Sequence, residues 1–120
     1  MAKIMVVDDA RSELKLIENI LKSAGLEVVC FPDGESLEER MVEERPDLLL
    51  LDIVMPKRNG YEILRSLKRD GRTKSTPVVL VSSKNQESDR VWGKRQGADD
   101  YLGKPFTAEQ LVTVVRQFVR

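Results

Sequence analysis

The side chains best suited to chemistry in this chain all follow short apolar runs. Asp8 and Asp9 come after the first run, and Asp52 follows four consecutive leucines. Ser82 and Lys104 come after two further runs nearer the C-terminus. Carboxylate oxygens suit hard divalent cations, and Mg²⁺ commonly takes one or two carboxylates together with water and a phosphate oxygen. These residue types therefore indicate a magnesium site with a hydroxyl and an ammonium group beside it.

The elements between these residues explain how they could meet. Strands are predicted where the apolar runs are short and continuous: Lys3–Val7, Glu27–Phe31, Asp47–Leu51, Pro77–Val81 and Tyr101–Leu102. Helices are predicted in the intervening stretches, around residues 14–24, 37–45, 60–70, 86–96 and 111–119. This alternation indicates a parallel sheet with helices on both faces. Ligands of such sheets bind outside the carboxyl ends of the strands, so the polar residues are expected to converge there.

The charge at that edge limits what it can bind. The carboxylates of Asp8, Asp9 and Asp52 repel one another, and Lys104 returns only one positive charge. A divalent cation would relieve this repulsion, whereas an anion without a metal would be repelled. A flavodoxin-type phosphate site is therefore disfavoured, and residues 8–11 also lack the hydroxyl-rich loop that such a site needs.

A carboxylate in these surroundings can act as a nucleophile toward phosphorus. Asp52 is the best candidate because it follows the most apolar predicted strand. Phosphoryl transfer depends mainly on positioning and on neutralising the equatorial oxygens. Mg²⁺, the ammonium of Lys104 and the hydroxyl of Ser82 could supply that neutralisation.

The composition excludes several other classes of protein. The 120 residues contain no histidine and one cysteine, Cys30, which excludes histidine-dependent catalysis, thiolate zinc sites and an internal disulfide. Lysine plus arginine number 20, as do aspartate plus glutamate, and this balance argues against nucleic acid or a membrane surface as partner. No apolar run approaches the roughly 20 residues of a membrane span. The single thiol and the lack of a signal peptide lead us to expect a cytoplasmic protein.

Taken together, these features resemble the receiver domain of two-component response regulators, the single-domain chemotaxis type in particular. The resemblance spans the chain and rests on Val7-Asp8-Asp9, Leu51–Pro56, Asn59-Gly60, Ser82-Ser83, Gly97-Ala98, Tyr101 and Lys104–Phe106. It implies an α/β, flavodoxin-like fold: a doubly wound, five-stranded parallel sheet in the order 2-1-3-4-5 with five helices. It also implies one receiver domain over residues 1–120, without an output domain.

The resemblance implies a role for each acidic residue. Asp52 resembles the phosphoacceptor, which would receive its phosphoryl group from a sensor histidine kinase. Asp9 and Asp52 look like direct Mg²⁺ ligands. Asp8 would act through water, and the carbonyl of Val54 would complete the metal site.

The remaining roles concern the response to phosphorylation. Lys104 resembles the lysine that contacts the phosphoryl group, and its bond to Pro105 resembles the family's cis peptide. Ser82 looks like the hydroxyl that moves toward the phosphoryl oxygen, and Tyr101 like the aromatic switch that follows it inward. A downstream protein, or a second copy in a phosphorylation-dependent dimer, is expected to read the surface around Arg90, Lys94, Tyr101 and Val114. Otherwise the chain is expected to be a monomer.

Other parts of the sequence are less specific. Residues 91–98 are similar to the fourth-helix region of single-domain regulators of type IV pilus twitching motility. Trp92 fits either packing within its helix layer or a partner contact. The charged run Glu38–Glu44 is expected to be a solvated helix face. The side chain of Val54 offers no hydrogen bond that could orient a hydrolytic water, whereas Lys84 could reach one. The sequence therefore does not determine how long the phosphoryl group persists.

Two alternative functions remain. One is a degenerate receiver that binds partners without phosphorylation, and the complete set of site residues argues against it. The other is a magnesium phosphohydrolase with an aspartyl nucleophile. That class normally has an acid-base carboxylate two residues after the nucleophile, where this chain has Val54. We therefore expect no enzymatic activity beyond the chain's own phosphoryl transfer and hydrolysis.

Overall fold

Strands and helices alternate throughout the computed structural model, which describes all residues from 1 to 120. The strands are β1 (Lys3–Val7), β2 (Glu27–Phe31), β3 (Leu48–Leu51), β4 (Val78–Ser82) and β5 (Asp100–Gly103). The helices are α1 (Arg11–Ser23), α2 (Leu37–Glu44), α3 (Gly60–Arg69), α4 (Glu87–Arg95) and α5 (Ala108–Arg116).

Every predicted element is present, and only some of the ends differ from the prediction. Helix α5 begins at Ala108, before its first large apolar residue, because a capping box starts the helix. In that box, Thr107 accepts a hydrogen bond from the backbone of Gln110, whose side chain accepts one from the backbone of Thr107. Apolar periodicity identifies the face that a helix buries, but the polar cap decides where the helix starts.

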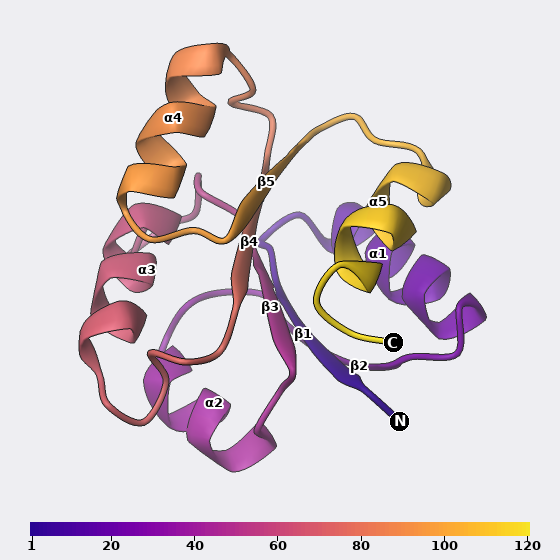
Figure 1. Cartoon of the computed structure of the whole chain (residues 1–120), viewed down its shortest axis with the longest axis horizontal. Helices are drawn as coiled ribbons and strands as arrows, with labels where there is room; N and C mark the ends of the chain where they lie inside the picture. Colours follow the sequence, from indigo (N-terminus) through magenta and orange to yellow (C-terminus); the bar gives the residue numbers. More distant parts are fainter.

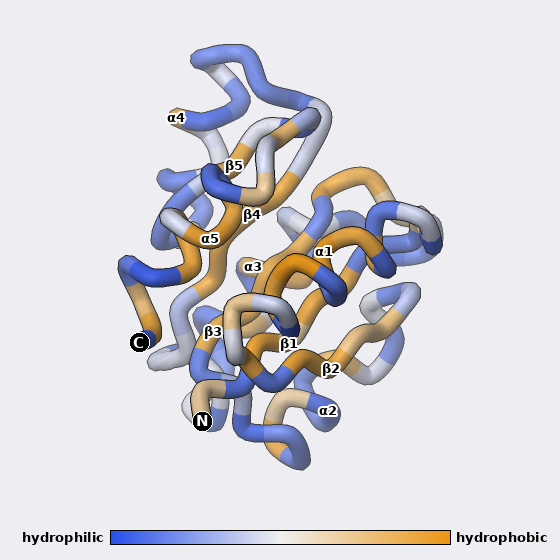
Figure 2. The backbone as a smooth tube through the Cα atoms, turned by 90° about the vertical axis from the view of Figure 1, so that its right-hand side faces the viewer, coloured by the Kyte–Doolittle hydropathy of each residue, from blue (hydrophilic) through white to orange (hydrophobic).

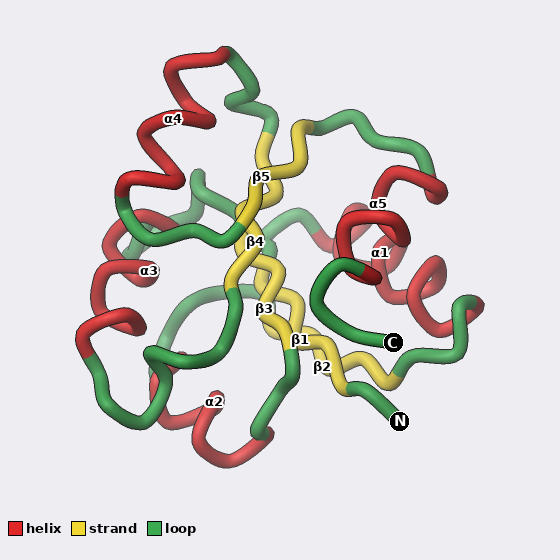
Figure 3. The backbone as a smooth tube through the Cα atoms, viewed as in Figure 1, coloured by secondary structure: helices red, strands yellow, loops and turns green.

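All five strands are parallel and lie in the order β2-β1-β3-β4-β5, which confirms the predicted flavodoxin-like sheet. In Figure 1 the sheet is seen nearly edge-on, with α1 and α5 on one face and α2, α3 and α4 on the other. Figure 3 shows the same division, with the strands between two groups of helices. The central strand β3 is buried along its whole length, as its run of leucines predicted.

Alternation of side chains along the strands divides the core into two halves. Leu49 and Leu51 belong to a cluster of 15 buried residues on the side of α2, α3 and α4. Leu48 and Leu50 point to the opposite face and join a cluster of 13 buried residues with α1 and α5. The hydropathy colouring of Figure 2 follows this pattern, with apolar strands and a largely polar α4. None of the helices has the length and apolar character that a membrane span requires.

The first residue of α3 fits only as glycine. A Cβ atom on Gly60 would lie 2.3 Å from the carbonyl oxygen of Asp52 and 2.8 Å from the Cα of Ile53. Both contacts are with backbone, which cannot rotate away. We therefore expect Gly60→Ala to destabilise the protein by about 1–3 kcal/mol, the usual cost of overpacking. Urea unfolding measures this cost.

Gly71 provides the matched control, because a Cβ there would meet no atom within 4 Å. Gly71→Ala should change the free energy of unfolding by less than about 1 kcal/mol. Equal stability of the two variants would show that the close approach of α3 to the end of β3 carries no energetic constraint.

Candidate functional site

Backbone hydrogen bonds extend the sheet by one residue at its carboxyl edge. The amide of Asp8 donates to the carbonyl of Phe31 at 3.2 Å, and the amide of Asp52 donates to the carbonyl of Val7 at 3.0 Å. Each aspartate is thus the first residue beyond its strand and still has its backbone fixed to a neighbouring strand. This explains why the sequence places the carboxylates in the same location.

Three carboxylates meet at this edge. Ligand oxygens of Asp8, Asp9 and Asp52 lie within 4.8 Å of one another. Asp8 is 2% exposed and Asp52 is 7% exposed, whereas Asp9 is open to solvent. The donor set is all oxygen, two of its members are buried, and one side is accessible. These properties fit a hard divalent cation such as Mg²⁺.

The structure also brings Lys104 to this cluster from the far end of the chain. Its amide donates to the carbonyl of Ser82 at 2.9 Å, and its peptide bond to Pro105 is cis. Its ammonium lies 2.8 Å from Oδ2 of Asp8 and 3.8 Å from Oδ2 of Asp52. Burial lowers the pKa of Lys104, but its hydrogen bonds to carboxylates outweigh burial and leave the pKa raised.

Sequence reasoning missed Glu13, which forms an ion pair with Lys104. Glu13 lies in the first turn of α1, where an acidic residue is usually explained by the helix dipole alone. That helix begins just after Asp9, so its first turn must lie near the carboxyl edge. The short separation in sequence between Asp9 and the start of α1 was the signal from which a contact of Glu13 with the site could have been predicted.

Burial dominates the electrostatics of Asp52. Desolvation raises the pKa of Asp52 to about 6, and the negative charges of Asp8 and Asp9 add to the rise. Lys104 and the backbone amide of Ile53 act in the opposite direction, the latter by donating to Oδ1 at 2.8 Å. The single ammonium therefore compensates only part of the cost of charging this carboxylate.

The loop after β3 is anchored by residues that the sequence did not single out. Arg58 donates two hydrogen bonds to the carboxylate of Glu38, at 2.7 and 3.0 Å, and a third to the carbonyl of Gly34 at 3.1 Å. The prediction of a solvated face was wrong for Glu38, whose side chain is only 15% exposed. Hydrogen bonds from Arg58 lower the pKa of Glu38 to about 2. Val54, in the same loop, leaves its side chain 59% exposed.

Ser82 and Tyr101 lie side by side beneath the loop that leads to α4. Ser82 is fully buried, and its Oγ accepts a hydrogen bond from the amide of Lys84 at 3.2 Å. The hydroxyl of Tyr101 donates to the carbonyl of Lys84. Burial raises the pKa of Tyr101 to about 12, and a hydrogen bond from Ser82 partly opposes the rise.

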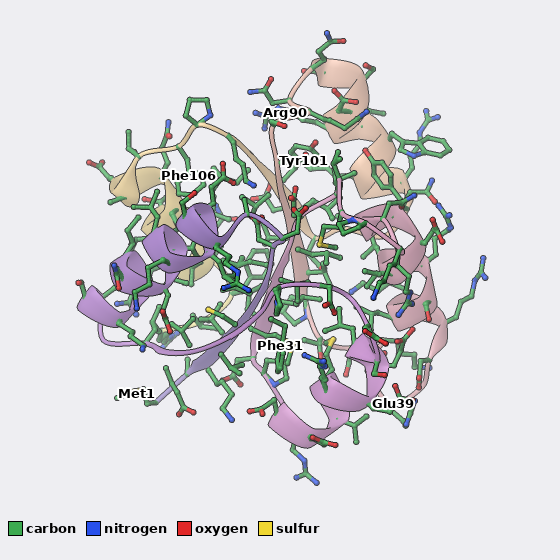
Figure 4. All side chains as sticks on the ribbon, turned by 180° about the vertical axis from the view of Figure 1, so that it is seen from behind. Met1, Phe31, Glu39, Arg90, Tyr101 and Phe106 are labelled. Atoms are coloured by element: carbon green, nitrogen blue, oxygen red, sulfur yellow. The ribbon has the colours of Figure 1, made fainter.

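The predicted partner surface is only partly accessible. Tyr101 is 4% exposed, with its ring between the sheet and α4 and the guanidinium of Arg90 5.5 Å from the ring centroid (Figure 4). The ring of Tyr101 thus already occupies an inward position, and its role as a switch within the partner surface stays a prediction. Arg90 and Val114 instead line a hollow of about 440 Å³ between α4, β5 and α5. Lys94 is exposed on α4.

Trp92 is neither fully packed nor free. It is 48% exposed and meets Tyr61 edge-on, with the ring centroids 6.5 Å apart. Packing between α3 and α4 therefore covers part of the indole and leaves the rest open to solvent.

The raised pKa of Asp52 predicts how stability depends on pH when no Mg²⁺ is present. The folded state binds this proton more tightly than the unfolded state, where the pKa is about 3.9. Stability is therefore lost as pH rises from about 4 to about 6. Asp52→Asn should remove that loss and raise the free energy of unfolding at pH 7 by up to about 3 kcal/mol, with a smaller gain at pH 4.

Urea unfolding at both pH values in a chelating buffer tests this expectation. Asp70→Asn is the control, because Arg72 lowers the pKa of Asp70 to about 2 and the charged form is already favourable. A larger gain for Asp52→Asn at pH 4 than at pH 7 would contradict the assigned electrostatics.

Comparison with known proteins agrees with this architecture. The response regulator receiver domain family matches residues 4–116. Protein PilH of Pseudomonas aeruginosa is 42% identical over 115 residues, covering 96% of this chain and 95% of PilH. The transcriptional regulatory protein CpxR of Escherichia coli is 41% identical over 120 residues, which span all of this chain and 50% of CpxR.

Solved structures show the same likeness. The Vibrio cholerae chemotaxis protein CheY4 superposes with a TM-score of 0.91 at 28% identity, covering 99% of both chains. The activated receiver domain of Klebsiella pneumoniae RstA superposes with a TM-score of 0.90 at 31% identity, covering 98% of both chains. The sequence match over nearly the whole chain, together with the fold and the acidic edge, places this protein in the response regulator receiver domain family.

Proposed function

We propose that this protein is a phosphorylation-dependent signalling switch whose phosphoacceptor is Asp52. The observation that carries the proposal is the position of the Asp52 carboxylate. It lies at the end of the central strand, within an acidic cluster that fits a divalent cation, and 3.8 Å from the ammonium of Lys104. A sensor histidine kinase is the phosphodonor that membership of this family implies.

The proposed reaction forms one bond and breaks another. A carboxylate oxygen of Asp52 bonds to the phosphorus of a phosphohistidine as the phosphorus–nitrogen bond breaks. The imidazole nitrogen keeps the electron pair and takes up a proton from solvent. Mg²⁺, when bound, supplies positive charge to the phosphoryl oxygens. Asp9, Asp52 and the carbonyl of Val54 would hold the ion directly, and Asp8 would hold it through water.

Lys104 and Ser82 supply the remaining donors. The ammonium of Lys104 is already next to Asp52, so only a short movement takes it to a phosphoryl oxygen. Before phosphorylation, Ser82 and Tyr101 both contact Lys84: the Ser82 hydroxyl accepts from its amide, and the Tyr101 hydroxyl donates to its carbonyl. When Ser82 turns to donate to the phosphoryl group, the amide of Lys84 loses its acceptor, and the residue to which Tyr101 donates is free to shift. The phosphorylation state would reach α4 through this exchange and through the Lys84 carbonyl.

The output surface follows from the same contacts. We infer that a downstream protein reads the region of α4, β5 and α5, where Arg90, Lys94 and Val114 are accessible. A dimer through this face is the alternative. The resemblance of residues 91–98 to regulators of twitching motility remains a prediction. That residues 1–120 act as a single receiver domain without an output domain remains a prediction.

The identity of the phosphoacceptor can be tested directly by mass. After incubation with acetyl phosphate and Mg²⁺, the intact protein should gain one phosphoryl group, and Asp52→Asn should gain none. Asp47→Asn, at the other end of β3, is the matched control and should behave as wild type. A gain that persists in Asp52→Asn would point to Asp8 or Asp9, and no gain in any variant would favour the degenerate receiver.

The role of Ser82 in transmission has its own test. Ser82→Ala should still accept the phosphoryl group, but the phosphorylation-dependent change in amide exchange across α4 and β5 should fall. Allosteric coupling commonly changes the affinity of one site by about 5- to 150-fold when the other is occupied. Loss of a coupling of this size should remove a large part of the change in amide exchange. Ser83→Ala removes an exposed hydroxyl from the next residue and should leave the response intact. A full response in Ser82→Ala would contradict the proposed coupling.

A further inference from the structure

Glu13 makes a contact that the phosphoryl-transfer reaction does not use. It extends from the first turn of α1 to the ammonium of Lys104. Its Oε2 atom is buried and has no hydrogen-bond partner apart from that ion pair, although the side chain as a whole is 42% exposed. A carboxylate oxygen withdrawn from water and turned toward one cation is oriented by that cation.

The ammonium of Lys104 is therefore shared unequally among three carboxylates. It makes a hydrogen bond of 2.8 Å to Asp8 and an ion pair with Glu13, while Asp52 stands at 3.8 Å. Hydrogen bonds to a charged nitrogen are generally no longer than about 3.2 Å. In the unphosphorylated protein, the lysine thus binds two carboxylates in preference to the phosphoacceptor.

A phosphoryl group on Asp52 must compete for this ammonium. This group places roughly two negative charges and three acceptor oxygens within reach of Lys104. An ammonium has three N–H donors, so this contact need not replace another outright, but movement of Lys104 toward Asp52 would lengthen its contact with Asp8 or Glu13. Glu13 is the partner more easily released, because the exposed part of its side chain can return to water. Its own negative charge also repels the incoming phosphoryl group.

We propose that Glu13 is a positioning residue that holds Lys104 back from the phosphoacceptor and thereby limits the accumulation of the phosphorylated form. This inference rests on the proposed function of Asp52. Glu13 acts through the lysine and does not belong to the acidic cluster that fits the cation. Its effect should therefore persist at saturating Mg²⁺.

Phosphorylation kinetics provide the first measurement. At saturating Mg²⁺, Glu13→Gln should be phosphorylated by acetyl phosphate about fivefold faster than wild type, which corresponds to about 1 kcal/mol, the upper range for a partly exposed ion pair. Glu18→Gln is the matched control. It removes the same charge from the same helix, where Glu18 pairs with Lys15 and Lys22 away from the site.

Stability of the unphosphorylated protein gives a second readout. A double-mutant cycle in urea compares Glu13→Gln, Lys104→Gln and the double variant with wild type. Glu13→Gln should destabilise the protein while Lys104 is present, because an ion pair is lost. In the Lys104→Gln background the same change should stabilise it, because only repulsion among carboxylates remains. A residue with a purely structural role would have the same effect in both backgrounds.

The outcomes separate the inference from the proposed function. Absence of phosphorylation on Asp52 in wild type would overturn the proposed function and, with it, this inference. Normal phosphorylation of wild type, with Glu13→Gln no faster than Glu18→Gln, would overturn the inference alone. An additive double-mutant cycle would also overturn it, whereas faster phosphorylation together with a reversed sign in the cycle would support it.

Discussion

The cost of burying charged carboxylates at the end of the central strands is the constraint on which the rest of this structure depends. Asp8 and Asp52 are nearly inaccessible to water, and both follow strands whose side chains are apolar on both faces. Desolvation in such surroundings disfavours the charged form. A protein that keeps carboxylates in this position must offer them a cation, and Lys104 is the only one paired with either of them here.

This incomplete compensation makes the edge of the sheet responsive. One ammonium cannot neutralise several carboxylates, so any event that adds positive charge or redirects Lys104 changes the energy of the whole cluster. The backbone beneath is firmly held, since the amides of Asp8 and Asp52 continue the hydrogen-bond ladder of the sheet. Rearrangement is consequently confined to side chains and to the loops that follow the strands.

Much of this arrangement could be predicted from the sequence, because strand ends are visible in it. Asp8, Asp52 and Ser82 directly follow apolar runs, Lys104 follows one after a single glycine, and parallel pairing forces such positions to one edge. Contacts made from helices and loops could not be predicted in the same way. Whether an acidic residue on α1 points to the site or to solvent depends on the direction of its side chain and on the reach of Lys104.

Two further examples show the same limit. The pairing of Arg58 with Glu38 joins a loop to a helix, and neither residue has an apolar pattern that would reveal its contact. Burial of Tyr101 depends on a neighbour that lacks a side chain. Gly93 is the only buried residue of α4, and it lies against the tyrosine ring. A glycine inside a polar helix gave no indication of that contact.

The packing of Gly93 has a consequence for how this chain can change over evolutionary time. A methyl group at position 93 would lie 2.9 Å from Cδ1 of Leu80 and 3.1 Å from Cδ2 of Tyr101. These three positions therefore share one fixed volume, and a gain at one must be balanced by a loss at another or by an outward shift of α4. Related chains with a larger residue at position 93 should carry a smaller one at the position of Leu80 on β4 or of Tyr101 on β5. A substitution at position 93 should thus be inherited together with one at position 80 or 101.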